Sequence, residues 1–224
     1  HSTFWFREKL SDTENKVRYW SRIVEEGVRV TFQIPMAHYE NKSLTNTLSE
    51  YILSKETKGI ESGIAPKLKH NLVASKSDFL YGDAMIVKDT KQWIDECIKK
   101  TINTIQMEDI DYKITYNESW YHVTTTNGMH EPHIHPRCSW CGVYYIKSGN
   151  HDSGDTVFEN PVKSTYIDRG NLFLDHMHTL RIKPQDGLLV IFPSYLSHYQ
   201  AIYKGTEDRI VVAFNASIDK REED

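Results

Sequence analysis

The chain has 224 residues with a formal net charge of −4 at pH 7, and this length suits one large domain with a sizeable core. The slightly acidic balance argues against a nucleic-acid partner, because nucleic-acid-binding domains usually carry a strongly basic surface. No apolar stretch reaches the roughly 18–20 residues of a membrane helix and no signal segment opens the chain, so we expect a soluble, cytoplasmic protein with no membrane partner.

The N-terminal part, about residues 1–110, is predicted to be a buttress of helices with one strand. Val28–Ile34 alternates apolar and polar side chains, which is typical of a strand. Ser43–Lys55 repeats apolar side chains at near-helical spacing. Asp89–Met107 carries the strongest helix signal, because its isoleucines and tryptophan share one face while charged residues lie largely opposite. We expect these helices to pack against a sheet.

From residue 111 onward, strand signals follow one another without another convincing helix. Gly, Pro, Asn and Asp separate the predicted strands, which are Tyr112–Tyr116, Ser119–Thr125, Ser139–Ile146, Thr156–Glu159, Leu172–Leu174, Thr179–Lys183, Leu188–Phe192, His198–Tyr203 and Arg209–Asn215. Short strands at this spacing predict a double-sheet jelly roll or a related barrel. We therefore expect a mostly β fold with flanking helices, in a single domain over residues 1–224 whose jelly-roll core spans about 111–217.

The segment Gly128–Pro136 contains three histidines, His130, His133 and His135. Side chains two residues apart in an extended segment project the same way, so His133 and His135 can offer two imidazoles to one divalent transition metal. The alternative is an exposed polar loop. A turn-forming glycine, two prolines and a following strand favour a reactive group at the mouth of a sheet. His130 is three residues from His133, an odd spacing that should turn it away, and we assign it to substrate contact.

Three cysteines occur, and an odd, low count fits a reducing compartment. Cys138-x-x-Cys141 has the spacing of half a zinc site or of a redox motif. Residues three apart on a strand point to opposite faces, and no second pair completes a four-cysteine site. We therefore expect no functional role for this pair.

Four motifs follow one another in the second half of the chain. They are His-x-His-Pro at 133–136, Ser-x-x-Gly-Val-Tyr-Tyr at 139–145, Phe-Pro-Ser-Tyr-Leu-x-His at 192–198 and Arg-Ile-x-x-x-Phe-Asn at 209–215. Their order over residues 118–217 resembles the 2-oxoglutarate/Fe(II)-dependent oxygenases of bacterial and phage genomes, relatives of the prolyl-hydroxylase-like enzymes. The resemblance implies a double-stranded β-helix, the jelly roll of the cupin-like proteins.

The resemblance also implies the cofactors and the residues that hold them. His133 matches the first ligand of an Fe(II) ion and His198 the distal ligand, while Arg209 matches the anchor for the distal carboxylate of 2-oxoglutarate, with O₂ as the oxidant. Fe(II) favours two histidines and one carboxylate with open positions, and a guanidinium can hold a carboxylate with two hydrogen bonds. The alternatives are a surface turn for His198 and a salt bridge with Asp208 or Glu207 for Arg209.

The chain departs from the family pattern at His135, where the usual enzymes carry Asp or Glu. Three arrangements remain open. The metal is held by three imidazoles, or a carboxylate such as Glu159 or Asp155 replaces His135, or the site has two protein ligands, as in relatives similar to the aspartyl/asparaginyl β-hydroxylases. We favour His135 as a ligand.

Other polar residues receive secondary assignments. Ser139 and Tyr145 share a face of their strand and are candidates to hydrogen-bond 2-oxoglutarate. His130, Trp120 and His178, the last in a second His-x-His at a predicted hairpin tip, are candidates to contact substrate.

The expected activity is hydroxylation of an unactivated C–H bond in an amino acid, peptide or small metabolite, with release of succinate and CO₂. The partner is then a small-molecule or peptide substrate. The sequence leaves open the identity of that substrate, halogenation or desaturation as other outcomes, and the oligomeric state. A cupin-like three-histidine dioxygenase without 2-oxoglutarate would keep the histidines and leave Arg209 without a role. A jelly-roll interaction module without enzymatic activity would need neither the histidines nor Arg209.

Overall fold

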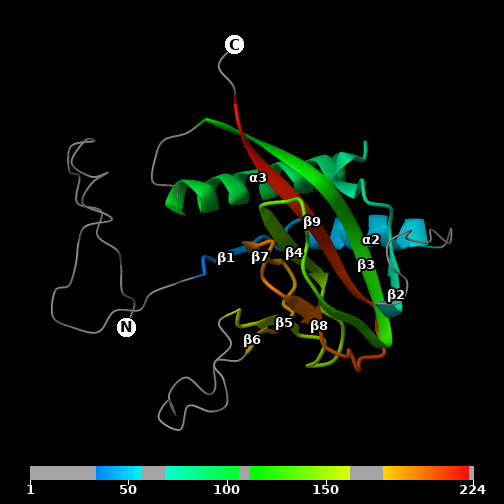
Figure 1. Ribbon diagram of the computed structural model, residues 1–224. Helices are drawn as coiled ribbons and strands as arrows, with labels where there is room; N and C mark the ends of the chain where they lie inside the picture. Colours follow the sequence, from blue (N-terminus) through cyan, green and yellow to red (C-terminus); the bar gives the residue numbers. More distant parts are fainter. Residues whose placement is uncertain (1–33, 57–68, 106–110, 162–178, 222–224) are drawn as a thin grey trace, which may run out of the picture. The chain divides into compact units, whose positions relative to one another are not determined.

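Two long antiparallel strands, β3 (Tyr112–His133) and β9 (Arg209–Lys220), form the centre of the sheet in the computed structural model (Figure 1). The structure describes residues 34–56, 69–105, 111–161 and 179–221. Nearly all of the predicted strand Val28–Ile34, the predicted strand Leu172–Leu174 and His178 lie outside these residues.

The strands pair in the order β1-β7-β4-β9-β3-β8-β5-β6, and β2 pairs with the other edge of β3. All of these pairings are antiparallel. Because β3 pairs with β9 over its first part and with β8 at its end, the sheet curls into a half-barrel, which confirms the predicted jelly-roll class. The remaining strands are β1 (Ala37–Glu40), β2 (Lys69–Ala74), β4 (Trp140–Lys147), β5 (Thr156–Glu159), β6 (Thr179–Ile182), β7 (Leu188–Pro193) and β8 (His198–Gln200).

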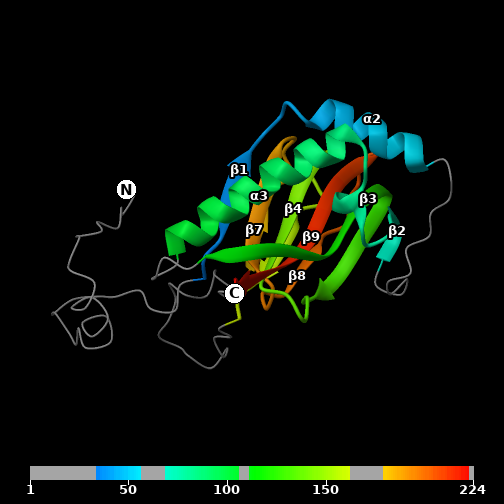
Figure 2. The same ribbon diagram turned by 90° about the horizontal axis from the view of Figure 1, so that it is seen from above.

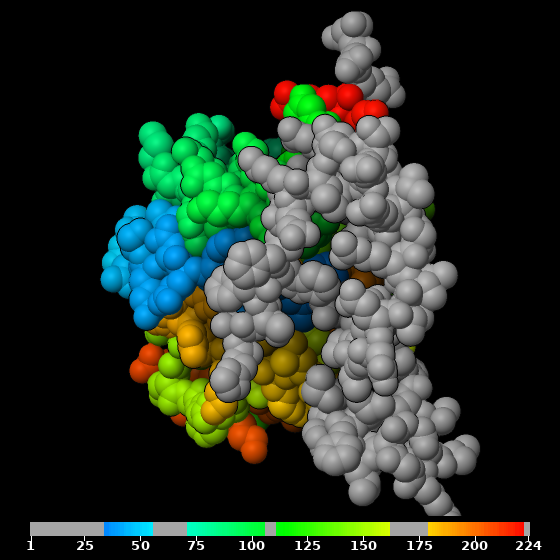
Figure 3. Space-filling model, turned by 90° about the vertical axis from the view of Figure 1, so that its left-hand side faces the viewer, coloured from blue at the N-terminus to red at the C-terminus, as the bar shows by residue number. Residues whose placement is uncertain are grey.

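Two helices, α2 (Thr45–Glu56) and α3 (Met85–Ile105), cover one face of this sheet, and a single 3₁₀ turn, η2 (Phe79–Tyr81), precedes α3 (Figure 2). The surface view shows the β1–α2 segment, in blue, lying against α3, in green (Figure 3). Buried isoleucines of α3 pack on the aromatic rings of the sheet, and Trp93 lies 4.9 Å from Tyr144 between ring centroids. Both predicted helices are confirmed, although α3 begins one turn earlier than expected. No helix in the described part of the chain is long and apolar enough to cross a membrane.

The two central strands are buried on both faces. Residues 119–124 of β3 and 209–216 of β9 are all buried, because the helices cover one face and the strands β8 and β5 curl over the other. Alternate residues of β9 therefore divide between two environments. Ile210 and Val212 join the apolar core under the helices, whereas Arg209 and Asn215 line a pocket on the opposite face.

The predicted boundary between Tyr112–Tyr116 and Ser119–Thr125 is wrong, because both segments belong to β3. Pairing with β9 shifts by one residue between Tyr116 and Glu118, so the exposed Asn117 is accommodated in a bulge instead of ending the strand. β3 also continues to His133, which therefore ends a strand. The strands β1 and β2 were not predicted.

Candidate metal centre

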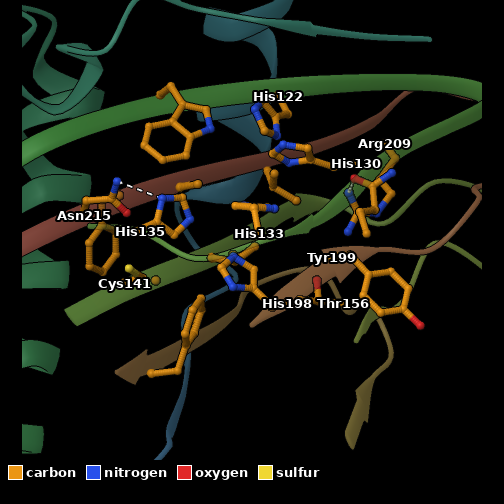
Figure 4. Close-up of a pocket in the computed structure, with 18 residues that line it drawn as sticks. His122, His130, His133, His135, Cys141, Thr156, His198, Tyr199, Arg209 and Asn215 are labelled. Atoms are coloured by element: carbon orange, nitrogen blue, oxygen red, sulfur yellow. Dashed lines mark hydrogen bonds between the residues drawn. The ribbon is translucent and has the colours of Figure 1, made fainter. Parts of the chain in front are cut away.

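Three imidazoles converge at one end of the pocket. Figure 4 shows His133, His135 and His198 pointing toward one another. Their candidate ligand nitrogens all lie within 4.8 Å of one another. His133 ends β3 and pairs directly with His198, which begins β8. The backbone N–H of His135 donates to the Ser194 carbonyl over 3.2 Å, which ties the segment after β3 to the turn before β8. Strand pairing thus brings together histidines that are far apart in sequence.

Hydrogen bonds orient two of these rings for metal binding. His133 Nδ1 lies 2.7 Å from the Glu131 carbonyl oxygen, and His198 Nδ1 lies 3.0 Å from the Leu196 carbonyl oxygen. A carbonyl oxygen only accepts hydrogen bonds, so Nδ1 carries the proton in both rings and Nε2 keeps its lone pair. Burial, aided by the nearby His133 imidazole, lowers the pKa of His198 to about 3. His198 is therefore neutral, as metal ligation requires.

The third histidine is connected to a carboxylate through an amide. Asn215 Nδ2 lies 3.1 Å from His135 Nδ1, and this contact is the dashed line in Figure 4. The same Nδ2 donates to Glu118 Oε2 over 2.9 Å. Asn215 and Glu118 pair across β9 and β3, and Asn215 is buried. Sequence reasoning missed this contact, although Asn215 closes the Arg-Ile-x-x-x-Phe-Asn motif. Such outer groups fix the orientation and basicity of a ligating imidazole.

The two carboxylates that were considered as alternative ligands make other contacts. Glu159 Oε2 accepts a hydrogen bond from Ser197 Oγ over 2.8 Å, and Asp155 lies 3.6 Å from Arg181. Neither belongs to the converging group that forms among the described residues. Three neutral imidazoles suit a divalent first-row transition metal such as Fe(II) and leave the charge of the ion uncompensated.

Arg209 lines the same pocket and is only 1 % exposed. Its Nη1 donates to Gln200 Oε1 over 2.7 Å, its guanidinium lies 5.5 Å from the Tyr145 ring centroid, and its Nε has no hydrogen-bond partner. In the described part of the chain, no carboxylate forms an ion pair with Arg209, and Glu207 pairs with Lys147 instead. Burial lowers the pKa of Arg209, yet a guanidinium stays charged in proteins. A buried cation in this state favours an anionic ligand.

Of the other predicted site residues, some line the pocket and some do not. Trp120 and His130 line the pocket. Tyr145 is buried behind it and donates to Oγ1 of the lining residue Thr156 over 2.6 Å. Ser139 is not among the lining residues, and its Oγ accepts a 3.4 Å hydrogen bond from the Ile218 backbone N–H.

The predicted orientation of His130 is wrong. Its ring stacks on that of His133, with centroids 4.1 Å apart, because the pairing of β3 with β8 shifts between these two residues and breaks the alternation. His122 is a further lining histidine, with its ring 5.6 Å from His130. Sequence reasoning missed His122, because alternation along β3 looks the same whether a buried side chain faces a pocket or the core.

The expectation that Cys138 and Cys141 point apart is also wrong. Their sulfur atoms lie 3.9 Å apart, since Cys138 precedes β4 in a turn where Arg137 adopts a positive φ of 61°. Strand alternation therefore does not apply to this pair.

Comparison with known proteins agrees with this geometry. Residues 118–215 match the family model described as "Putative 2OG-Fe(II) oxygenase". The fold is similar to a Pseudomonas putida prolyl-4-hydroxylase, with 12% identity, 85% of this chain and 95% of that chain covered, and a TM-score of 0.57. A search of the curated proteins finds no match.

Two further solved structures carry bound groups. The viral collagen prolyl hydroxylase of Paramecium Bursaria Chlorella virus-1, in its 2OG complex, has 12% identity, 82% and 96% coverage of this chain and that one, and a TM-score of 0.55. The epimerase SnoN, in complex with Fe3+, alpha ketoglutarate and nogalamycin RO, has 9% identity, 84% and 82% coverage, and a TM-score of 0.60. Residues 118–215 of this chain therefore match the model of the 2OG-Fe(II) oxygenase family, which is the family that the order of the four motifs indicated.

Proposed function

We propose that the protein is a non-haem Fe(II)/2-oxoglutarate-dependent oxygenase that hydroxylates a C–H bond of a small-molecule or peptide substrate. The observation that carries the proposal is the presence, in one pocket, of a three-histidine cluster and a buried guanidinium that has no ionic partner among the described residues. The cluster alone would suit many kinds of metalloprotein, and the guanidinium alone would suit any anion. Together they match a metal ion and a dicarboxylate that binds to it.

Each part of the pocket has a separate task in this proposal. His133 and His198 would hold Fe(II) through Nε2, with their Nδ1 atoms fixed by backbone carbonyls, and His135 would supply the third imidazole. Arg209 would bind the distal carboxylate of 2-oxoglutarate with the donors that Gln200 leaves open. When bound, Fe(II) and 2-oxoglutarate supply the reactivity toward O₂, with release of succinate and CO₂. The chain supplies placement and keeps the anion-binding end dry.

Three imidazoles are compatible with a dianionic cosubstrate. A carboxylate ligand would cancel part of the metal charge, whereas neutral histidines leave the full double charge to attract 2-oxoglutarate. Glu118 supplies its negative charge farther out, through Asn215.

The substrate would enter beside the stacked rings of His130 and His133 and the indole of Trp120. The structural neighbours include prolyl hydroxylases and an epimerase, so the fold supports more than one reaction. We rank an amino acid first, then a peptide, then another small metabolite.

A second candidate is a three-histidine metalloenzyme that does not use 2-oxoglutarate. The all-imidazole cluster favours it, since no carboxylate in the described chain joins the triad. It leaves the buried charge of Arg209 without a ligand, and we therefore rank it second.

Anaerobic titration separates these functions. The first proposal predicts a metal-to-ligand charge-transfer band that forms only when both Fe(II) and 2-oxoglutarate are added, and slow succinate formation on admission of O₂. Succinate in place of 2-oxoglutarate is the control, because it lacks the keto oxygen needed to chelate the metal. Iron binding without the band would favour the second candidate. Absence of iron binding would favour an interaction module.

A further inference from the structure

Cys138 and Cys141 have no role in the proposed function. Cys141 is buried in β4 and lines the pocket, while Cys138 is half-buried in the turn between His135 and β4. Both are free thiols with their sulfur atoms 3.9 Å apart. The third cysteine, Cys97, is buried in α3 among the core residues under the helices.

The geometry allows these thiols to form a disulfide with a small movement. A disulfide needs its sulfur atoms about 2.05 Å apart, so they must approach by roughly 1.9 Å. Cys141 is fixed between β7 and β9, because it pairs with Phe192 on one side and Asn215 on the other. Cys138 lies in a turn, and its segment must supply the movement.

The same turn holds one of the candidate metal ligands. The Cys138 thiol donates to the carbonyl oxygen of His135 over 3.4 Å. Ser194 Oγ donates to the Cys138 carbonyl over 2.7 Å, and the Ser194 carbonyl accepts the backbone N–H of His135. Drawing Cys138 toward Cys141 removes the thiol donor from His135 and strains the contacts that fix its backbone.

We propose that Cys138 and Cys141 form a peroxide-sensitive dithiol that closes to an intramolecular disulfide and thereby weakens metal binding by His135. The half-buried Cys138 sulfur attacks hydrogen peroxide, whose O–O bond breaks, so that Cys138 becomes a sulfenic acid and one water leaves. The Cys141 sulfur then attacks the oxidised sulfur, the S–O bond breaks, and a second water leaves as the S–S bond forms. One peroxide is reduced and two thiols are oxidised.

Thiol mapping of the metal-free protein tests whether the disulfide forms. The reduced protein is treated with hydrogen peroxide, denatured, alkylated and digested, and the masses of its peptides are measured by mass spectrometry. We expect Cys138 and Cys141 to escape alkylation and to be joined, lighter by two hydrogen atoms, while Cys97 is alkylated. Cys97→Ser should give the same cross-link. Cys141→Ser should retain a sulfenic acid at Cys138 that dimedone captures, because the second thiol is missing.

Metal affinity tests whether the disulfide weakens metal binding, an inference that rests on the proposed metal site. Oxidised wild-type protein should bind Co(II) at least about 10-fold more weakly than reduced protein, a loss in the range of disturbed outer contacts, and dithiothreitol should restore it. Peroxide should leave the Co(II) affinity of Cys138→Ser unchanged.

Several results would overturn these inferences separately. Alkylation of both cysteines after peroxide, or a disulfide between two chains, would overturn the dithiol. An intramolecular disulfide with unchanged Co(II) affinity would overturn its coupling to the metal. Absence of Co(II) binding by the reduced protein would count against the proposed function and leave the thiol result standing.

Discussion

The two faces of β9 differ in what they require from their surroundings. Ile210 and Val212 point into the core under α3 and are satisfied by packing alone. Arg209 and Asn215 are as deeply buried on the opposite face, yet both carry polar atoms that lack a hydrogen-bond partner among the described residues. A buried polar group without a partner costs stability, so the pocket face would gain from a bound ligand that supplies partners, whereas the helix face needs none.

This difference explains how one strand supports both fold and site. Alternation gives each face its own residues, so the chemistry can vary on one face while the core stays constant on the other. Substitutions on the two faces should therefore separate stability from binding.

The largest effect is expected at the three histidines of the pocket face. His133→Ala, His135→Ala and His198→Ala should each lower iron affinity by more than about 100-fold, since loss of a ligand exceeds the 10–100-fold cost of an outer contact. Glu159→Ala and Asp155→Ala should retain iron, because these carboxylates lie in other contacts. Equilibrium dialysis with metal analysis measures both. Metal loss in Glu159→Ala with retention in His135→Ala would establish a two-histidine, one-carboxylate site.

Arg209→Ala should weaken 2-oxoglutarate binding by about 2–5 kcal/mol, the cost of removing one partner of a desolvated charge pair. Iron affinity should stay the same, because Arg209 is outside the converging triad. Anaerobic calorimetric titration of the metal-free protein with Fe(II), followed by titration of the iron-loaded protein with 2-oxoglutarate, measures both affinities. Unchanged 2-oxoglutarate affinity would make Arg209 a structural residue.

Ile210, which follows Arg209 in β9, should show the opposite pattern, with a loss of stability and no loss of ligand binding. Ile210→Ala should lower the free energy of unfolding by about 2–5 kcal/mol, as expected for a truncated core residue, and leave the 2-oxoglutarate affinity of the folded protein unchanged. Urea unfolding and the same titration test the pair. If Ile210→Ala reduced ligand affinity as strongly as Arg209→Ala, the two faces would not be independent.

Asn215→Ala should lower iron affinity about 10–100-fold, because the contact that connects His135 to Glu118 is lost. Asn117→Ala is the matched control, since Asn117 accepts a hydrogen bond from Ser217 between the same two strands at an exposed position. Competition with a coloured chelator measures the difference. Equal iron affinities for the two variants would show that Asn215 does not position His135.

The smallest effect is a pH dependence of the metal-free protein. The pKa of His198 is lowered from its ordinary value near 6.5 to about 3, so between these values the unfolded chain binds a proton that the folded chain does not. Its contribution to stability is complete above pH 6.5 and is lost as the pH falls below it, by at most about 1.4 kcal/mol per unit. Thermal unfolding at pH 7.5 and 5.5 should show a smaller loss in His198→Gln than in wild type. An equal loss would assign the pH dependence to other groups.

The sequence by itself determined the fold class, the main helix and the residue types of the site. Periodicity is local, so alternation identified the strands and the shared side of His133 and His135, while the order of four motifs pointed to Arg209 and His198. These predictions need no knowledge of which strands pair.

Only the tertiary structure decided how residues meet between strands. The register of β3 against β8 sets His198 opposite His133, a register shift turns His130 onto His133, and the β3–β9 pairing joins Asn215 to Glu118. A turn outside the sheet brings Cys138 to Cys141. Register, bulges and turns are set by hydrogen bonds between distant segments and by the conformation of single residues, and neither leaves a periodic signal in the sequence.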